Sequence, residues 1–170
     1  MAMAQRTAAG DKIKRAQMLI DGSWTDSASG ESISVENPGN RQIIASIPRG
    51  RAEDVDRAVK AATSAFPGWS KVAPRERGRI LQKIADAIEA RVEELARIVA
   101  EETGNAIRTQ ARPESKGAAD IFRYFGGLAS ELKGETIPLG EHVLSYTRRE
   151  PIGVVGAIIP WNAPVLLGSL

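Results

Sequence analysis

Apolar residues recur at three- and four-residue steps in three stretches of the chain, and this spacing predicts three helices. The first covers residues 53–66 and is closed by Pro67-Gly68. The second, residues 74–104, starts with a proline at a tolerated first-turn position and stops at a glycine. The third begins at Pro113 and continues through Leu132. Because a helix gains most of its stability by burying its apolar stripe, we expect the long stripe of the second helix to be core.

The apolar pattern of the third helix is interrupted by Gly126-Gly127. Each glycine inside a helix costs roughly 1 kcal/mol relative to alanine. Two interpretations stay open at this point: the helix breaks there, or another backbone approaches it closely.

Two other regions alternate with a period of two. Between residues 18 and 48, Asp21-Gly22 is a strong signal for a two-residue hairpin, and a second turn reads Asn-Pro-Gly-Asn at 37–40. We predict antiparallel meander strands there. In residues 134–149 the alternation returns with apolar and polar side chains on both faces, which does not suit the core of a monomer.

The stretch from Gly153 to Ile159 is apolar apart from its glycines and carries the β-branched Val154, Val155, Ile158 and Ile159, as expected of a strand covered on both faces of a parallel sheet. Pro160 ends it, and Pro164 opens a short helix that Asn162 is placed to cap. Ligands of open α/β sheets gather at this edge, where strands end and helices begin.

Residues 149–156 read Arg-Glu-Pro-Ile-Gly-Val-Val-Gly, and residues 159–162 read Ile-Pro-Trp-Asn. Further strings are Leu-Ile-Asp-Gly-Ser-Trp at 19–24, Asn-Pro-Gly at 37–39 and Glu-Thr-Gly at 102–104. In their order and spacing they resemble the amino-terminal part of the NAD(P)-dependent aldehyde dehydrogenase superfamily. The resemblance extends from Met18 to Leu170. At 104–106, Gly-Asn-Ala departs from the Gly-Lys-Pro that is common in the family.

The resemblance implies an α/β fold: the amino-terminal part of the aldehyde dehydrogenase fold, a Rossmann-like cofactor domain with an antiparallel meander and a protruding oligomerisation arm. Residues 18–132 and 152–170 would belong to the cofactor-binding domain, after a flexible leader at 1–17. Residues 133–151 would form the bridging arm, and the catalytic domain is not present in this chain. In the family the arm adds strands to a neighbouring subunit, so we expect a homodimer or homotetramer through residues 134–149.

The same resemblance implies an enzyme that oxidises an aldehyde to a carboxylic acid with NAD or NADP. Asn162 matches the family asparagine whose side-chain amide donates to the oxyanion that forms when a cysteine attacks the aldehyde. Ile158, Ile159, Pro160 and Trp161 match positions that line the cofactor cleft. Two plainer readings stay open: Asn162 only caps the following helix, and the apolar residues are simple core packing.

Composition limits the remaining possibilities. The chain has 170 residues, 42% of them hydrophobic, and no cysteine, which excludes a cysteine nucleophile within these residues. The resemblance implies that the family's catalytic cysteine and its glutamate base lie downstream. No apolar run approaches the length that spans a bilayer, and the start lacks a signal-peptide apolar region, so we expect a cytoplasmic protein. His142 stands without a cluster of metal ligands, so we expect no metal site.

Three rivals remain. The sequence pI of about 9.1 invites a nucleic-acid function, but residues 1–17 carry a net charge of +3 and the remainder −1, and no nucleic-acid motif is present. A non-catalytic dinucleotide-binding or oligomerisation module is the second rival. A CoA-acylating semialdehyde dehydrogenase, which shares the scaffold, is the third. The aldehyde and the choice between NAD and NADP cannot be read from these residues.

Overall fold

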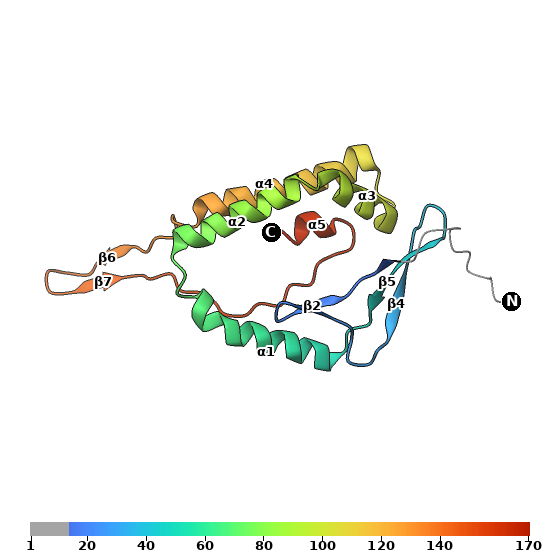
Figure 1. The fold of residues 1–170 in the computed structure, drawn as a ribbon. Helices are drawn as coiled ribbons and strands as arrows, with labels where there is room; N and C mark the ends of the chain where they lie inside the picture. Colours follow the sequence, from blue (N-terminus) through green and yellow to red (C-terminus); the bar gives the residue numbers. More distant parts are fainter. Residues whose placement is uncertain (1–13) are drawn as a thin grey trace.

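The computed structural model describes residues 14–170 (Figure 1). Most of the predicted leader, residues 1–17, therefore lies outside the described residues. Its last part differs from the expectation: β1 (Lys14–Arg15) pairs in parallel with β5 (Ile43–Pro48), with Lys14 opposite Ala45. A backbone ladder thus begins before the predicted boundary.

The predicted antiparallel strands are confirmed, but they form two hairpins in separate sheets instead of one continuous meander. β2 (Met18–Ile20) and β3 (Ser23–Thr25) form a hairpin. Asp21 and Gly22 connect them with φ angles of 53° and 71°, the pair of positive values that a type I′ turn requires. β4 (Ser32–Glu36) pairs antiparallel with β5, and the predicted turn at 37–40 lies between them. This completes a sheet in the order β1-β5-β4.

Helix α1 (Ala52–Trp69) runs past its predicted stop and takes in Pro67. A proline in a helix lacks the amide donor that would bond four residues back, here to Thr63, and the helix continues for only two residues beyond Pro67. The helix closes beyond it, because the N–H of Ser70 donates to the carbonyl of Phe66 at 2.8 Å.

The predicted second helix is two helices, α2 (Pro74–Glu89) and α3 (Val92–Thr103). Arg91 leaves the helical region with φ −119° and ψ 17°, and its guanidinium binds the carboxylate of Glu94 at 2.7 and 2.8 Å. The apolar positions keep their three- and four-residue spacing across this break, so the pattern could not reveal it. Gly104, with φ 80°, ends α3 as predicted.

Helix α4 (Arg112–Leu128) follows one π-helical turn, η1 (Ile107–Ala111), and is not broken at Gly126-Gly127. Of the two interpretations, close approach is the correct one. A Cβ added to Gly78 of α2 would lie 2.5 Å from the carbonyl oxygen of Gly126. α2 and α4 accordingly lie side by side along their length (Figure 1).

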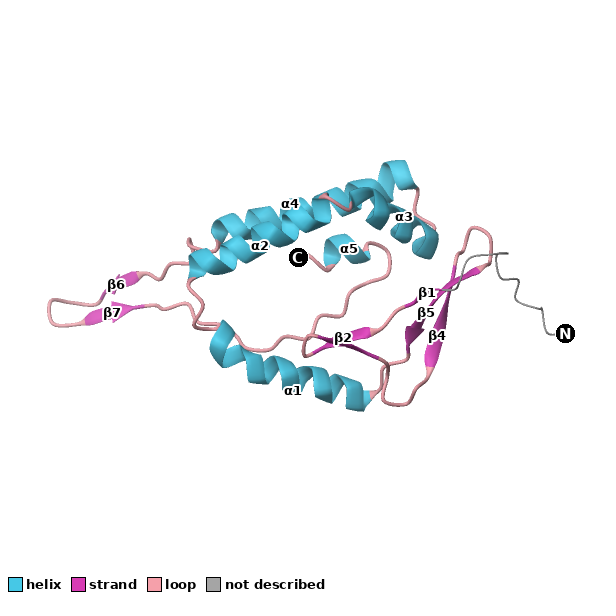
Figure 2. Ribbon diagram, in the orientation of Figure 1, coloured by secondary structure: helices cyan, strands magenta, loops and turns pink. Residues whose placement is uncertain are grey.

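The alternating region forms a hairpin of β6 (Thr136–Pro138) and β7 (Leu144–Tyr146), joined antiparallel. It projects from one end of the molecule (Figure 2), as the protruding arm was expected to do. Several of its apolar side chains are exposed, among them Leu139, Leu144 and Tyr146.

The predicted strand at 153–159 is not formed. Residues 151–160 have neither helical nor strand structure, and Ile158 is fully exposed. A strand exists only as part of a hydrogen-bonded ladder, and no strand within residues 14–170 pairs with this segment. It instead runs as irregular chain from β7 to α5 (Pro164–Leu167), which packs on α4 (Figure 2).

The buried core lies where α3, η1 and α4 meet. Ala96, Val99 and Ala111 form its centre, and Val165 of α5 packs against them. None of the helices in the described part of the chain is long and apolar enough to cross a membrane.

Candidate functional site

Asn162 lies in the turn that links the irregular segment to α5. Its backbone carbonyl accepts a hydrogen bond from the side-chain Nδ2 of Asn105 at 3.1 Å. Asn105 follows the glycine that ends α3, so the turn is tied to the end of a core helix. The residue as a whole remains exposed, which leaves its side-chain amide accessible.

The expectation that Asn162 caps the following helix is wrong. The N-cap position of α5 is Ala163, which offers no side-chain acceptor. Instead the N–H of Val165 donates to Oε1 of Glu114 at 2.9 Å. Glu114 lies in the first turn of α4 and is only 7% exposed, so its carboxylate takes a backbone donor where water is largely excluded.

Close packing also fixes α5 on α4. A Cβ added to Gly117, one turn after Glu114, would lie 3.0 Å from Cδ1 of Leu166. That distance is tighter than ordinary contact, so the glycine lets α5 approach. Together with the packing of the partly buried Val165 against the core, this attaches the turn that contains Asn162 to the start of α4.

An ion pair ties α3 to α4 beside Glu114. The guanidinium of Arg112 binds both carboxylate oxygens of Glu93, with Nη2 donating to Oε2 at 2.8 Å. The Arg112 hydrogen bond lowers the pKa of the Glu93 carboxyl, and the same contact raises the pKa of Arg112. The first turn of α4 is therefore held to α3 by the Arg112–Glu93 ion pair and to α5 by the Glu114–Val165 hydrogen bond.

The four expected cofactor-cleft residues directly precede Asn162 in the irregular segment. Their side chains are exposed: Ile158 completely, Trp161 to 75% and Ile159 to 41%, with Pro160 exposed as well. Within residues 14–170 these four side chains are therefore not part of the core. Their role in a cofactor cleft stays a prediction.

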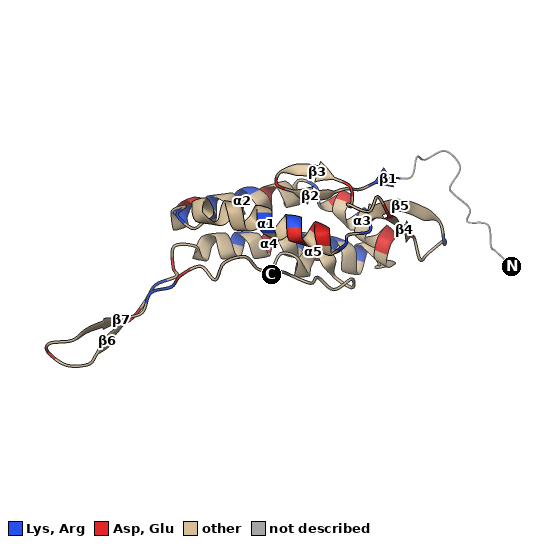
Figure 3. Ribbon diagram, turned by 90° about the horizontal axis from the view of Figure 1, so that it is seen from below, with Lys and Arg blue, Asp and Glu red and all other residues tan. Residues whose placement is uncertain are grey.

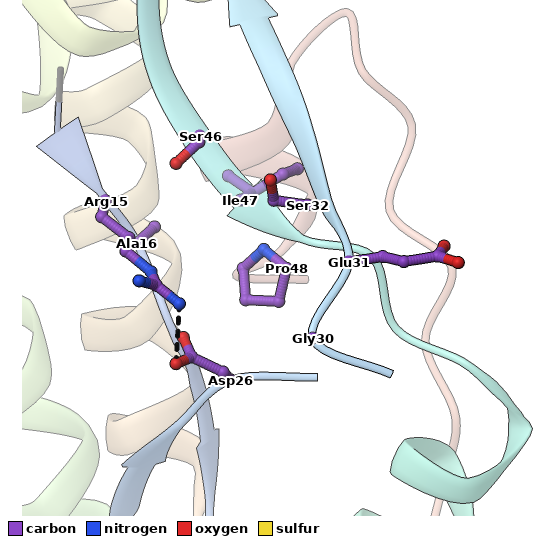
Figure 4. Close-up of a pocket in the computed structure, with 9 residues that line it drawn as sticks. All are labelled: Arg15, Ala16, Asp26, Gly30, Glu31, Ser32, Ser46, Ile47 and Pro48. Carbon is purple, nitrogen blue, oxygen red and sulfur yellow. Dashed lines mark hydrogen bonds and ion pairs between the residues drawn. The ribbon is translucent and has the colours of Figure 1, made fainter. Parts of the chain in front are cut away.

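A pocket of about 240 Å³ lies elsewhere, between the β-strands and the turn before β4 (Figure 4). Arg15 and Asp26 line one side of it and pair at 2.8 Å. Glu31 at its rim is paired with Arg51. These groups neutralise one another, and none of the expected site residues lines the pocket. Four separate segments form it, so no local sequence signal could have indicated it.

No group of three or more His, Cys, Asp or Glu side chains within 14–170 could hold an ion. His142 is exposed in the loop of the β6–β7 hairpin, as expected of a solvated residue. In Figure 3 basic and acidic positions are interspersed along α1 and α2.

Comparison with known proteins gives consistent matches. The profile of the "Aldehyde dehydrogenase family" matches residues 24–170. Aldehyde dehydrogenase 1 of Tanacetum cinerariifolium is 40% identical over 160 residues, which cover 93% of this chain and 32% of that protein.

Two solved structures are similar as well. The NAD-dependent aldehyde dehydrogenase of Sinorhizobium meliloti is 40% identical with a TM-score of 0.89, covering 96% of this chain and 34% of that one. PnpE of Pseudomonas sp. WBC-3, solved in complex with nicotinamide adenine dinucleotide, is 44% identical with a TM-score of 0.87, covering 91% and 32%.

The chain thus spans about a third of the length of the relatives that it matches. The resemblance seen in its motifs is confirmed, and so is the fold class: these residues correspond to the amino-terminal, cofactor-binding part of the fold. The chain belongs to the aldehyde dehydrogenase family.

Proposed function

We propose that a protein carrying these residues together with the rest of the family fold oxidises an aldehyde to a carboxylic acid with NAD(P)+. The observation that carries the proposal is the exposed Asn162 side chain on a turn anchored by Asn105 and Glu114, within the matched region. An anchored turn with a free amide is what an oxyanion donor requires, because the donor must be in place before charge develops.

In this reaction a cysteine thiolate, supplied by residues outside these 170, attacks the aldehyde carbon. The oxyanion that forms accepts a hydrogen bond from the Asn162 amide. A neutral donor suits this position, since the oxyanion must be stabilised and still collapse to expel hydride. Water then hydrolyses the thioester to the acid.

NAD(P)+, when bound, supplies the hydride acceptor. The exposed apolar side chains of Ile158, Ile159 and Trp161, with Pro160, fit a partly apolar ligand at the point where the chain reaches Asn162. We assign these four residues to the cofactor cleft. The NAD complex of the similar PnpE supports the choice of a nicotinamide cofactor.

The direct test is the full-length protein incubated with aldehydes and NAD+ or NADP+, with and without CoA. The proposal predicts reduced cofactor and carboxylic acid in equal amounts, formed without CoA. Acyl-CoA as the product would instead indicate the CoA-acylating reaction. Absence of cofactor reduction with every aldehyde tested would contradict the proposal.

Substitution of Asn162 separates its role from that of the fold. Asn162→Ala should lower kcat by roughly 10² to 10³ and leave cofactor affinity near normal. Asn40→Ala is the control: Asn40 is also exposed in a turn, but it lies between β4 and β5, where its Oδ1 accepts the N–H of Gln42 at 3.0 Å. Equal turnover in the two variants would eliminate the oxyanion role.

We further propose that the β6–β7 hairpin joins subunits into a homodimer or homotetramer. Its exposed Leu139, Leu144 and Tyr146 are apolar groups that strand addition to a neighbouring subunit would cover. The cytoplasmic location and the absence of a nucleic-acid partner stay predictions from the sequence.

A further inference from the structure

The turn that carries Asn162 is held from two sides by distant side chains. Asn105 donates to the carbonyl of Asn162, 57 residues away in sequence, and Glu114 accepts the N–H of Val165, 51 residues away. The Glu114 contact is the more buried of the two, since its residue is 7% exposed and Asn105 lies near the surface. Both contacts come from the α3–α4 region.

We propose that Glu114 is a positioning residue for Asn162, acting through the N–H of Val165; this rests on the oxyanion role proposed above. The first N–H groups of a helix have no acceptor within the helix and must find one outside it. An asparagine just ahead of a helix commonly supplies that acceptor with its own side chain. Glu114 takes over this task for α5, so the Asn162 side chain is not committed to the helix.

The charge and reach of Glu114 fit this role. A carboxylate acceptor makes a stronger hydrogen bond to a backbone N–H than a neutral acceptor does. From the first turn of α4, the long glutamate side chain reaches Val165 at 2.9 Å. Aspartate, shorter by one methylene, would leave a gap at the same backbone position.

Packing makes the position of α5 sensitive to this contact. Leu166 lies against Gly117 of α4. Val165 packs against Ala96, Val99 and Ala111, so α5 contacts α3, η1 and α4. Without the hydrogen bond to Glu114, the first residues of α5 can shift against these contacts. Asn162 would shift with them, because it lies two residues before Pro164, the first residue of α5. A misplacement of about 1 Å can lower a rate by roughly 10².

A double-mutant cycle in the full-length enzyme tests the proposal. Glu114→Ala should lower kcat by roughly 10- to 10²-fold with little change in cofactor affinity. In an Asn162→Ala background the same substitution should cost no more than about twofold, because the group it positions is already gone. Ser115→Ala is the control: Ser115 is fully buried beside Glu114, but its hydroxyl bonds to Ala111 within the preceding turn.

Two conservative variants keep the test decisive if the alanine variant does not fold. Glu114→Gln keeps an acceptor at the same reach and should retain most of the turnover, whereas Glu114→Asp keeps the charge and should lose it. Equal losses in both backgrounds, or an aspartate variant faster than the glutamine one, would overturn the proposal. If Asn162→Ala lowers kcat and Glu114→Ala does not, the positioning role of Glu114 is refuted and the oxyanion role of Asn162 stands. If Asn162→Ala keeps the wild-type kcat, both roles are refuted.

Discussion

The contact between α2 and α4 at Gly78 gives a prediction whose size follows from the structure. A Cβ at residue 78 would lie 2.5 Å from the Gly126 carbonyl oxygen and 3.2 Å from Cβ of Ala129. The first distance is shorter than real Cβ contacts, and the atom it meets is backbone, so no change of rotamer relieves it. The two helices must separate.

Two opposing effects decide whether Gly78→Ala raises or lowers the free energy of unfolding. Replacing glycine by alanine inside a helix gains about 1 kcal/mol. Overpacking a buried contact costs about 1 to 3 kcal/mol, and a clash with backbone belongs at the upper end. We therefore expect a net loss of about 2 kcal/mol in the free energy of unfolding, the difference between these two estimates.

Urea unfolding of the full-length protein measures this loss as a lower midpoint at an unchanged m-value. Gly127→Ala is the matched control, because a Cβ there meets nothing within 4 Å and should stabilise by up to about 1 kcal/mol. A Gly78→Ala protein as stable as the wild type would refute the reasoning.

Three further predictions follow from the same structure. Backbone N–H groups of Arg51 and Ala28 lower the pKa of the buried Asp54 carboxyl below 3.8, so its stabilising effect is present above that value and is lost as the pH falls through the folded-state pKa. Asp54→Asn should flatten this acid-side loss in unfolding measured against pH, and parallel curves would argue against it. Deleting residues 134–149 should dissociate the oligomer before it unfolds the cofactor domain, so an unchanged mass in light scattering would count against the hairpin as the interface. The purified 170-residue chain should be inactive and poorly soluble, because it has no cysteine and exposes Ile152 and Ile158; NADH formed from any aldehyde by this chain would disprove the first part.

The elements that local signals specify were predictable from the sequence. The Asp21-Gly22 hairpin follows from backbone conformations that those two residues favour, and Gly104 stops α3 for the same reason. The helix break at Arg91 was not predictable, because the apolar spacing continues through it. The β1–β5 pairing was missed because a strand of only two residues, Lys14 and Arg15, has no alternation of its own and pairs with a strand about 30 residues later.

Contacts between distant segments account for what sequence reasoning left open or missed at the site. Gly126 could be explained only once Gly78 was seen to lie against it. Glu114 carries no local sign of its contact with Val165, because nothing near it in sequence indicates the start of a helix 51 residues away. Asn162 itself was found because the residues around it resemble a family motif. The local pattern predicted that Asn162 caps α5, whereas the N-cap position in the structure is Ala163.

The kcat of full-length Asn162→Asp, measured beside its thermal stability, tests the central claim most directly. Asn162 does not cap α5, so this substitution should leave stability nearly unchanged. It places an anion where negative charge must develop, so kcat should fall by at least roughly 10² to 10³, the loss expected when an oxyanion donor is removed. A stable Asn162→Asp enzyme that turns over at the wild-type rate would contradict the account.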